Sequence, residues 1–309
     1  MKIVGPETLT YGVEDMDAAK RFWTDFGLGL AEETPGRLVF ETLEKTAIVV
    51  RPKDAADLPA AAEPGSTLRE LTWGVAAERD LVDIAAALKG WPSLRATNDA
   101  VRATDPNGYP IAFRVTRRVP VKRPLPGYNH ARDGGRVNRR STYHKQAHPE
   151  MISHVAWLAP KYDAAIDFYR NRLEFRMSDQ YPDDSIFLRA SAANQHHNLF
   201  LIKGSGRVGF HHVAFEMESI HEVIGGGLAM GEKGWETLIG PGRHAVSSAY
   251  FWYFKNPCGG FAEYDWDSDY LTDEWEPRDW PKSHATFAEW LLPSGLGRFK
   301  GFEPGQGFG

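Results

Sequence analysis

The chain repeats itself once along its length. Three segments of the first half recur in the second half, namely 17–23 as 163–169, 71–75 as 211–215 and 105–108 as 256–259. In both copies the third segment is a turn containing Pro or Gly that leads into a strand-forming run. The offsets between the copies are 146, 140 and 151 residues, which are nearly equal. The chain is therefore predicted to fold as two copies of one unit.

Each copy has the periodicity of a strand followed by an amphipathic helix and more strands. The first copy has predicted strands at 7–13, 37–42 and 47–51 and a helix at 17–26. The second has predicted strands at 152–158, 185–190 and 197–203 and a helix at 163–173. A further strand and helix at 71–88 and at 210–228 repeat the pattern within each half. The sequence thus predicts an α+β fold of four βαβββ modules in two pairs.

These modules divide the chain into four expected regions. Residues 1–118 form the first module pair, 119–150 a linker rich in Arg, Lys, Pro and Gly, and 151–268 the second module pair. Residues 269–309 form an extension with several tryptophans and a Gly-rich end at 301–309. Because so many aromatic side chains favour burial, the extension is expected to dock on the second domain or on a neighbouring subunit. A hydrophobic content of 42% is enough for a core in each domain.

Composition excludes several classes of partner. The net charge of -5 gives no attraction to nucleic acid or to anionic membranes, so a small molecule is the expected partner. No apolar run approaches the roughly 20 residues that span a bilayer, and the first ten residues do not resemble a signal peptide. A cytoplasmic protein is therefore expected. The single cysteine, Cys258, cannot form an internal disulfide.

Metal-ligand chemistry is predicted in the second copy only, since every one of the eleven histidines follows residue 129. The repeat sets three potential ligands opposite residues that are not expected to chelate: His154 opposite Thr8, His212 opposite Thr72 and Glu263 opposite Ala112. Two histidines and one carboxylate are the facial triad of non-haem Fe(II) oxygenases, which leaves coordination positions open for substrates. Adjacent strand residues face opposite ways, so only one of His211 and His212 can be a ligand, and the repeat selects His212.

A longer motif identifies a family. Residues 242–244 (Gly-Arg-His), followed after seven residues by 252–263, contain His244, an apolar residue before Tyr253, Asn-Pro, Gly and Glu263. This pattern resembles the vicinal oxygen chelate superfamily and, within it, the type I extradiol ring-cleavage dioxygenases of the catechol 2,3-dioxygenase kind. The resemblance covers roughly residues 5–280. Trp252 departs from the family pattern, which usually has an aliphatic residue or Phe there.

The resemblance implies a fold and a set of roles. The fold is two cup-like sheets, of which only the C-terminal one holds metal. His154, His212 and Glu263 would bind Fe(II), with Mn(II) as the alternative. The family carries an acid–base histidine in a His, Asp or Asn, apolar context, which residues 197–199 resemble, so His197 is preferred over the adjacent His196. Tyr253 and His244 would hydrogen-bond the substrate and the reacting oxygen.

The implied activity is extradiol cleavage of a catechol-type aromatic diol by Fe(II) and dioxygen. The product would be a ring-opened compound of the muconic semialdehyde type, and the reaction would belong to the catabolism of aromatic compounds. The resemblance also implies that the protein is a homo-oligomer. One alternative is a non-redox isomerase or lyase of the glyoxalase type, and another is a ligand-sequestering protein of the bleomycin-resistance type. The spacing of His244, Tyr253 and Glu263 favours the dioxygenase. The ring substituents of the diol are not predicted from the sequence.

Overall fold

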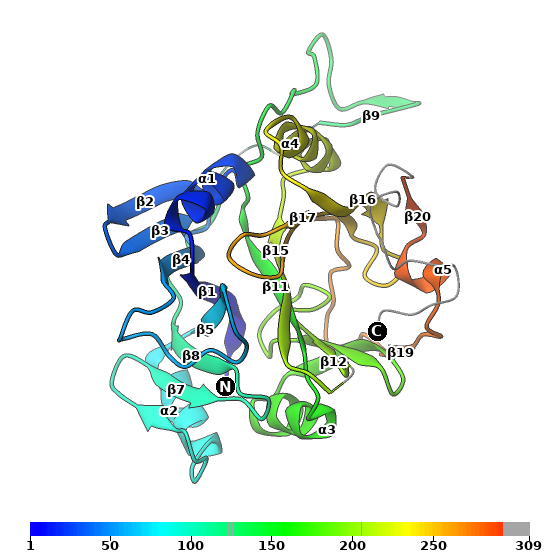
Figure 1. Ribbon diagram of the computed structural model, residues 1–309. Coiled ribbons are helices and arrows are strands. Elements are labelled where there is room, and N and C mark those ends of the chain that lie inside the picture. Colours follow the sequence, from blue (N-terminus) through cyan, green and yellow to red (C-terminus); the bar gives the residue numbers. More distant parts are fainter. Residues whose placement is uncertain (123, 125–126, 205, 293–309) are drawn as a thin grey trace.

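The computed structural model describes residues 1–122, 124, 127–204 and 206–292, and its architecture consists of two large mixed sheets (Figure 1). The first half, drawn blue to cyan, lies on one side of the molecule, and the second half, drawn green to red, lies on the other. Each half contains two strand-and-helix modules joined in one sheet. The predicted α+β architecture is therefore confirmed.

The first sheet is formed by the N-terminal half. Its strands are β1 (Ile3–Val13), β2 (Gly29–Thr34), β3 (Arg37–Glu41), β4 (Ala47–Pro52), β5 (Thr67–Val75), β6 (Arg95–Ala96), β7 (Val101–Thr104) and β8 (Pro110–Val115). Two helices, α1 (Met16–Phe26) and α2 (Glu78–Ala87), each follow the first strand of a module. Within the described residues the strand order is β2-β3-β4-β1-β5-β8-β7-β6, so the two modules meet where β1 pairs with β5.

The second sheet repeats this arrangement and extends it. Its main strands are β11 (Met151–Leu158), β12 (Arg176–Tyr181), β13 (Ser185–Arg189), β14 (Leu199–Ile202), β15 (Gly209–Glu216), β16 (Thr237–Arg243), β17 (Tyr250–Lys255) and β18 (Phe261–Trp266). Two short strands of the C-terminal extension, β19 (Arg278–Asp279) and β20 (Trp290–Leu291), pair with its two edges. In the part of the chain that the structure describes, the order is β19-β12-β13-β14-β11-β15-β18-β17-β16-β20.

Two helical segments differ in regularity between the halves. The helix predicted at 163–173 is instead a short α3 (Tyr162–Ile166) that continues as a π-helical segment η1 (Asp167–Arg172). Phe168 and Tyr169 of this π-helical segment are both buried, as are the equivalent residues Phe22 and Trp23 of α1. The second helix of this half, α4 (Ile220–Glu232), is a regular α-helix that begins at the N-cap Ser219.

One hydrophobic core runs through both halves, whereas the composition had suggested a separate core in each. The ring of Phe26, at the end of α1, lies 4.3 Å from the ring of Tyr264 on β18. Tyr109 stacks on Trp157 at 4.6 Å, again across the boundary between the halves. These rings belong to a single buried cluster. The domain boundaries at 118 and 151 remain a prediction, and the two sheets they separate are packed as one body.

The segment between the sheets is partly exposed and partly packed. It includes a small hairpin of β9 (Asn129–His130) and β10 (Asp133–Gly134), which projects beside α4 in Figure 1. Its last residues run between the halves, where Ala147 is fully buried and the backbone N–H of His148 donates to Glu222 at 2.8 Å. Residues 119–150 are thus a solvated connection only in their first part.

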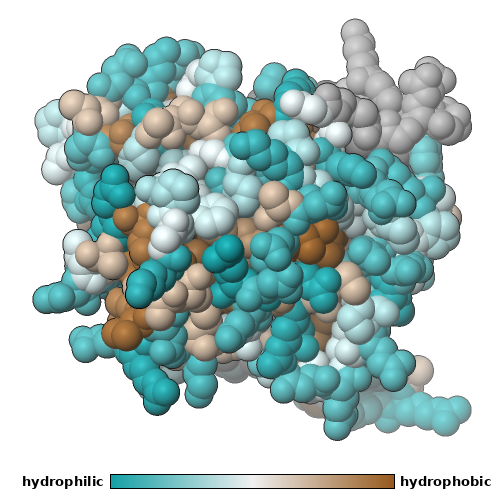
Figure 2. All heavy atoms as spheres, turned by 90° about the horizontal axis from the view of Figure 1, so that it is seen from below, coloured by the Kyte–Doolittle hydropathy of each residue, from teal (hydrophilic) through white to brown (hydrophobic). Residues whose placement is uncertain are grey.

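The C-terminal extension packs on the second sheet, as the number of tryptophans in it predicted. Trp280 packs with Tyr181, Phe187 and Val246, and α5 (His284–Phe287) lies on the side of this sheet that faces away from the first half (Figure 1). The Gly-rich end at 301–309 lies outside the described residues. Figure 2 shows the molecule from below, where hydrophilic side chains predominate and hydrophobic ones form small groups. Among the described residues, every helix is too short or too polar to span a bilayer.

Candidate metal centre

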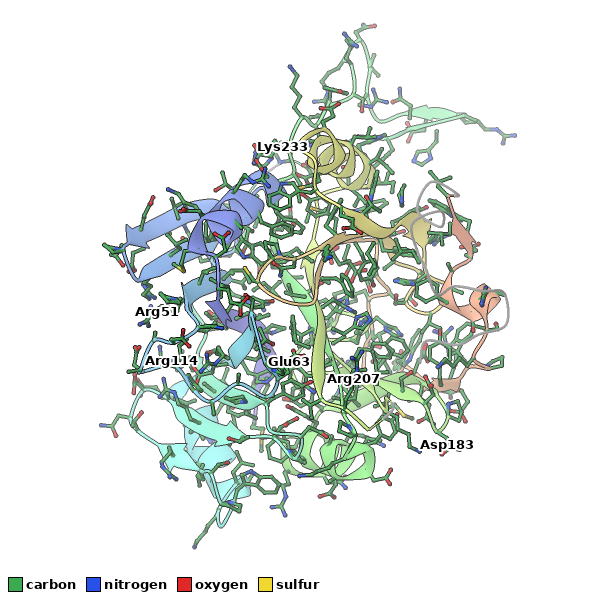
Figure 3. The ribbon with its side chains drawn as sticks, viewed as in Figure 1. Arg51, Glu63, Arg114, Asp183, Arg207 and Lys233 are labelled. Atoms are coloured by element: carbon green, nitrogen blue, oxygen red, sulfur yellow. The ribbon has the colours of Figure 1, made fainter. Side chains whose placement is uncertain are left out.

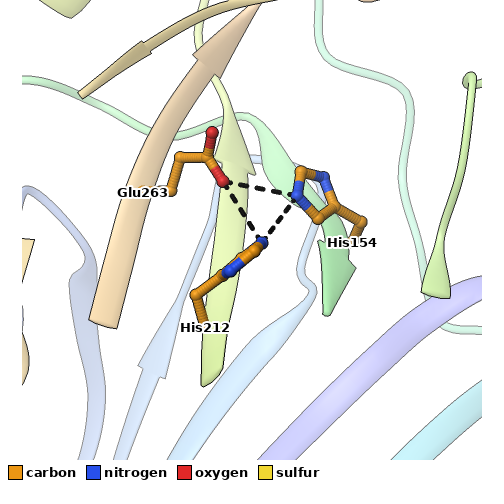
Figure 4. A group of neighbouring side chains, drawn as sticks. All are labelled: His154, His212 and Glu263. Atoms are coloured by element: carbon orange, nitrogen blue, oxygen red, sulfur yellow. Dashed lines mark hydrogen bonds and ion pairs between the residues drawn. The ribbon is translucent and has the colours of Figure 1, made fainter. Parts of the chain in front are cut away.

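Three potential ligands from the second sheet point toward one another (Figure 4). His154, His212 and Glu263 come from β11, β15 and β18, which are neighbours at the centre of the sheet. His154 Nε2 lies 3.0 Å from His212 Nε2 and 3.3 Å from Glu263 Oε2. His212 Nε2 lies 3.5 Å from the same oxygen. All three side chains are buried, so the structure brings together the three residues that the repeat identified.

The geometry and the charge of this group fit a bound divalent cation. Nitrogen and oxygen ligands about 2.1 Å from a metal lie roughly 3 Å from one another when their bonds are nearly perpendicular. Glu263 Oε2 accepts no hydrogen bond from the described residues although it is buried, and a cation would compensate its charge. Burial alone would raise the pKa of Glu263, but the close approach of His154 and His244 holds it well below its usual range. The residues therefore fit the metal that the sequence implies.

Neighbouring groups orient both histidines. His154 Nδ1 lies 3.2 Å from Ser153 Oγ, which donates to Asp265 Oδ2 at 3.1 Å. Burial would lower the pKa of His154, but Asp265 and Glu263 raise it to about 9, so positive charge is stabilised at this point. His212 Nδ1 lies 2.7 Å from His211 Nδ1. Such partners fix the tautomer and the ring orientation of a metal-ligating histidine.

Sequence reasoning missed these orienting residues. Asp265 follows Glu263 by two positions on one strand, so both carboxylates are on the same face of β18. A search for pairs of acidic residues spaced two apart in a predicted strand would have found Asp265. His211 was identified only as the histidine that cannot be a ligand. It still contacts His212 through its ring.

A cavity of about 450 Å³ lies against the three ligands. Its walls are mostly apolar side chains of the second sheet and of the C-terminal extension: Leu158, Phe187, Phe200, Ile202, Val246 and Phe287. Cationic side chains, including Arg207 and Lys282, also line it, and Arg207 lies on the segment between β14 and β15 (Figure 3). His284 lines it as well, although sequence analysis gave this residue no role. The cavity has the size and polarity of a small-molecule site.

His244 and Tyr253 lie together at this cavity, as expected. His244 Nε2 is 3.3 Å from the Tyr253 hydroxyl, and His244 Nδ1 is 2.8 Å from the backbone oxygen of Phe287. Because a carbonyl only accepts, His244 donates from Nδ1 and offers the lone pair of Nε2 to Tyr253. Burial raises the pKa of Tyr253 well above its ordinary value, so its hydroxyl remains a hydrogen-bond donor.

His197 lines the cavity, while His196 is fully buried behind it. The ring of His197 lies 4.0 Å from the ring of His154. Burial lowers the pKa of His197 well below its ordinary value, so this imidazole is neutral. The strand predicted at 197–203 begins later in the structure, because β14 starts only at Leu199 and both histidines precede it in a loop. The residue that the family pattern selected is nonetheless the one that faces the cavity.

One correspondence in the sequence repeat was wrong by two residues. In the first sheet Leu71 pairs with Leu9 and with Ile111, and Val213 makes the equivalent two pairings in the second sheet. His212 therefore corresponds to Glu70 and not to Thr72. Helix α2 begins at Glu78 and α4 at Ile220, which gives the same offset of 142 residues. A two-residue slip keeps a strand residue on the same face, so the hydrophobic pattern could not reveal the error.

The first sheet consequently has a carboxylate where the second has His212. Glu70 Oε2 pairs with Arg102 Nε at 3.2 Å beside a smaller cavity of about 220 Å³. A guanidinium neutralises this carboxylate, while Thr8 and Ala112 still correspond to His154 and Glu263. The expectation that only the second half holds a metal thus has two grounds. Arg102 occupies the carboxylate of Glu70, and Thr8 and Ala112 stand where the second half has His154 and Glu263.

Comparison with known proteins agrees with this architecture. Residues 151–264 match the family model of the Glyoxalase/Bleomycin resistance protein/Dioxygenase superfamily. Metapyrocatechase 2 of Cupriavidus necator is 34% identical over 170 residues, which are 54% of this chain and 52% of that protein. The chain thus matches about half the length of this relative. For residues 151–264, the resemblance to this superfamily that the sequence motif indicated is confirmed.

Solved structures share the whole fold at low sequence identity. The Mn(II)-bound glyoxalase from Novosphingobium aromaticivorans has a TM-score of 0.74 at 21% identity, covering 94% of this chain and 91% of the other. Homoprotocatechuate 2,3-dioxygenase from Arthrobacter globiformis has a TM-score of 0.72 at 21% identity, covering 95% and 90%. A halotolerant catechol dioxygenase, BphC, has a TM-score of 0.71 at 18% identity, covering 94% of both chains. Because one fold carries both activities, the function must be argued from the site.

Proposed function

We propose that this protein is an extradiol dioxygenase that cleaves a catechol-type aromatic diol with dioxygen. The observation that carries the proposal is the single cavity on which His154, His212 and Glu263 converge with His197, and where His244 bonds to Tyr253. The likeness to metapyrocatechase 2 and to catechol dioxygenases supports it. Both atoms of dioxygen enter the ring-opened product, so the reaction requires no external reductant.

His154, His212 and Glu263 would hold the metal, which we propose to be Fe(II), with Mn(II) as the alternative. Three protein ligands on one side leave positions for other ligands. When bound, the metal would supply Lewis-acid and redox chemistry between the diol and dioxygen. The remaining chemistry belongs to the protein.

The residues of the cavity can bind the diol and manage its protons. Neutral His197 can accept the proton of a diol hydroxyl and return it when the ring opens. The Tyr253 hydroxyl, whose single O–H points to His244 Nε2 in this structure, can turn that proton toward the reacting oxygen when the diol is bound. Apolar walls contact the ring and exclude water. A cavity of about 450 Å³ leaves room for substituents on that ring.

A metal-dependent isomerase or lyase of the glyoxalase kind is the second candidate. The structural likeness to an Mn(II)-bound glyoxalase favours it, since the same cup and a similar ligand set can serve non-redox chemistry. The pairing of His244 with Tyr253 next to Glu263 supports the dioxygenase instead. A ligand-sequestering function needs no metal ligands, and the buried triad speaks against it.

Oxygen consumption distinguishes these functions. The purified protein, loaded anaerobically with Fe(II), is mixed with a panel of substituted catechols while dioxygen and the absorbance of the ring-opened product are recorded. We expect uptake with product formation, lost in His212→Ala and retained in His130→Ala, an exposed histidine outside the site. Turnover of a hemithioacetal substrate without dioxygen uptake would favour the isomerase. Binding of diols without turnover would favour sequestration.

Two further expectations stay predictions. The homo-oligomeric state is tested by light scattering of the purified protein. The cytoplasmic location is tested by cell fractionation. Neither bears on the chemistry of the cavity.

A further inference from the structure

A chain of buried polar side chains leads away from the cavity behind His197. His197 Nδ1 lies 3.1 Å from His196 Nδ1, and His196 Nε2 lies 3.2 Å from Asp179 Oδ2. His196 and Asp179 are both 0% exposed. Asp179 belongs to β12, so these contacts connect β12 to the loop before β14, which carries both histidines. The proposed function gives neither His196 nor Asp179 a role.

Asp179 can only accept hydrogen bonds in this arrangement. Its Oδ1 accepts from the backbone N–H and from Nε of Arg278, at 2.9 and 3.2 Å. Its Oδ2 accepts from Arg278 Nη2 at 2.9 Å and from Trp280 Nε1 at 3.1 Å. Burial would raise the pKa of Asp179, but hydrogen bonds from His196 and Arg278 hold it below its usual range. His196 must therefore direct an N–H from Nε2 toward an ionised carboxylate.

This requirement determines the tautomers of both histidines. Arg278 makes its short ion pair with Asp179 at 2.9 Å and lies 4.0 Å from the partly exposed Asp269, so a second proton on fully buried His196 would add a positive charge with no carboxylate of its own. Neutral His196 carries its only proton on Nε2, and its Nδ1 is an acceptor. His197 must then donate from Nδ1 to His196, which leaves the lone pair on the Nε2 of His197. That nitrogen, on the opposite edge of the ring, is the one available to the cavity.

We propose that Asp179 and His196 are positioning residues that hold His197 in the tautomer with an unprotonated Nε2 facing the substrate cavity. This proposal rests on the proposed function in one respect: the tautomer matters because its unprotonated Nε2 can accept a proton from the bound diol. In the opposite tautomer, Nε2 would carry a proton and could not accept one. Arg278 and Trp280 belong to the C-terminal extension, so this segment anchors the first member of the chain.

Nitrogen NMR of the metal-free protein tests the tautomer without any activity. The protein is labelled with ¹⁵N in histidine, and His197→Asn assigns the signals of His197 by their loss. We expect the Nε2 of His197 to have the shift of an unprotonated imidazole nitrogen, and Asp179→Asn to reverse the two nitrogens. The side-chain amide of Asn donates to His196 Nε2, which moves the His196 proton to Nδ1 and reverses the chain. A protonated Nε2 in the unmodified protein, or no change in Asp179→Asn, overturns the proposal.

Kinetics test the consequence for catalysis. We expect Asp179→Asn to lower kcat by roughly 10²- to 10⁴-fold, with KM nearly unchanged, because general-base catalysis is lost while diol binding is kept. Asp273→Asn, an exposed carboxylate paired with Arg176 on the same strand β12, is the matched control and should retain full activity. In a His197→Asn background, Asp179→Asn should cause no further loss. A further loss there, or a rise in KM of similar size, would indicate a structural role and overturn the proposal.

A third variant covers the case in which Asp179→Asn does not fold. Arg278→Gln changes a partly exposed residue and removes the cation from Asp179. Without that cation the charge of Asp179 favours a second proton on His196, whose Nδ1–H would then donate to His197 Nδ1. The Nε2 of His197 should therefore become protonated, as in Asp179→Asn. An unchanged tautomer in this folded variant counts against the chain. If no diol is cleaved by the unmodified protein, the proposed function fails, and the NMR result still decides the tautomer.

Discussion

Single residues around the three ligands decide how strongly a metal is held. Asp265 Oδ2 lies 3.6 Å from His154 Nδ1, the ring nitrogen that does not face the other two ligands. Its carboxylate fixes the ring and increases the basicity of His154. We expect Asp265→Asn to weaken Fe(II) binding by roughly 10- to 100-fold, measured by competition with a chelator. The same change in Asp267, an exposed carboxylate two residues further along, should leave the affinity unchanged. Equal affinities in both variants would contradict this role for Asp265.

Another buried carboxylate should make stability depend on pH. Burial raises the pKa of Asp105 to about 7, against hydrogen bonds from the backbone of Tyr109 and Asn107. The unfolded chain releases this proton near pH 4, whereas the folded protein keeps it to about pH 7. Stability is therefore lost as pH rises from about 4 to about 7, by an amount on the order of a few kcal/mol.

Asp105→Asn removes this ionisation and keeps an oxygen that can accept the backbone bonds of the turn. We expect the variant to gain stability relative to the unmodified protein between pH 5 and pH 8, measured by urea unfolding at both values. Asp99→Asn, in an exposed loop, is the control. A stability difference that does not change with pH would refute the assigned pKa.

At the scale of elements, the end of α1 is constrained by the segment that joins the halves. Gly27 has a φ of 104° and closes α1, and a Cβ there would lie 1.9 Å from the backbone oxygen of Ala147. Only glycine satisfies both the left-handed backbone and this approach.

We expect Gly27→Ala to lower the free energy of unfolding by at least about 1–3 kcal/mol, seen as a lower midpoint in thermal unfolding. Gly36→Ala, where a Cβ meets nothing within 4 Å, should change the midpoint little. Similar midpoints for the two variants would show that the joining segment can move away from α1.

The sequence predicts elements better than it predicts the register between them. The repeat and the family motif located His154, His212 and Glu263 because a strand ligand requires only a residue type and a face. Periodicity could not decide whether His212 corresponds to Thr72 or to Glu70 of the first copy, since a slip of two residues preserves the face of every side chain. Nor could it place Asp179 beside His196, because their contact depends on how β12 and a loop pack and on Arg278 from the distant extension. Long-range polar contacts of this kind have no local signal.

At the scale of the whole molecule, the shared core makes the metal-free half part of the site's support. Phe26, at the end of α1, packs against Phe215 on β15 and Tyr264 on β18, which are the strands that carry His212 and Glu263. The structure also links the halves by polar contacts: Glu63, labelled at their boundary in Figure 3, accepts the backbone N–H of Phe210 at 2.7 Å. Losing either half would expose aromatic side chains of the other.

The two halves should therefore unfold together. We expect Phe26→Ala to lower the free energy of unfolding by about 3–5 kcal/mol, because a buried ring is lost at the junction. Hydrogen exchange should show the same loss of protection for amides of β1 and of β18, although only the first belongs to the half that carries the change. Val82→Ala on α2, where the side chain is 68% exposed, is the control for the loss of an apolar side chain. If protection fell in β1 alone, the halves would be separately folding domains, and the N-terminal sheet would not support the metal centre.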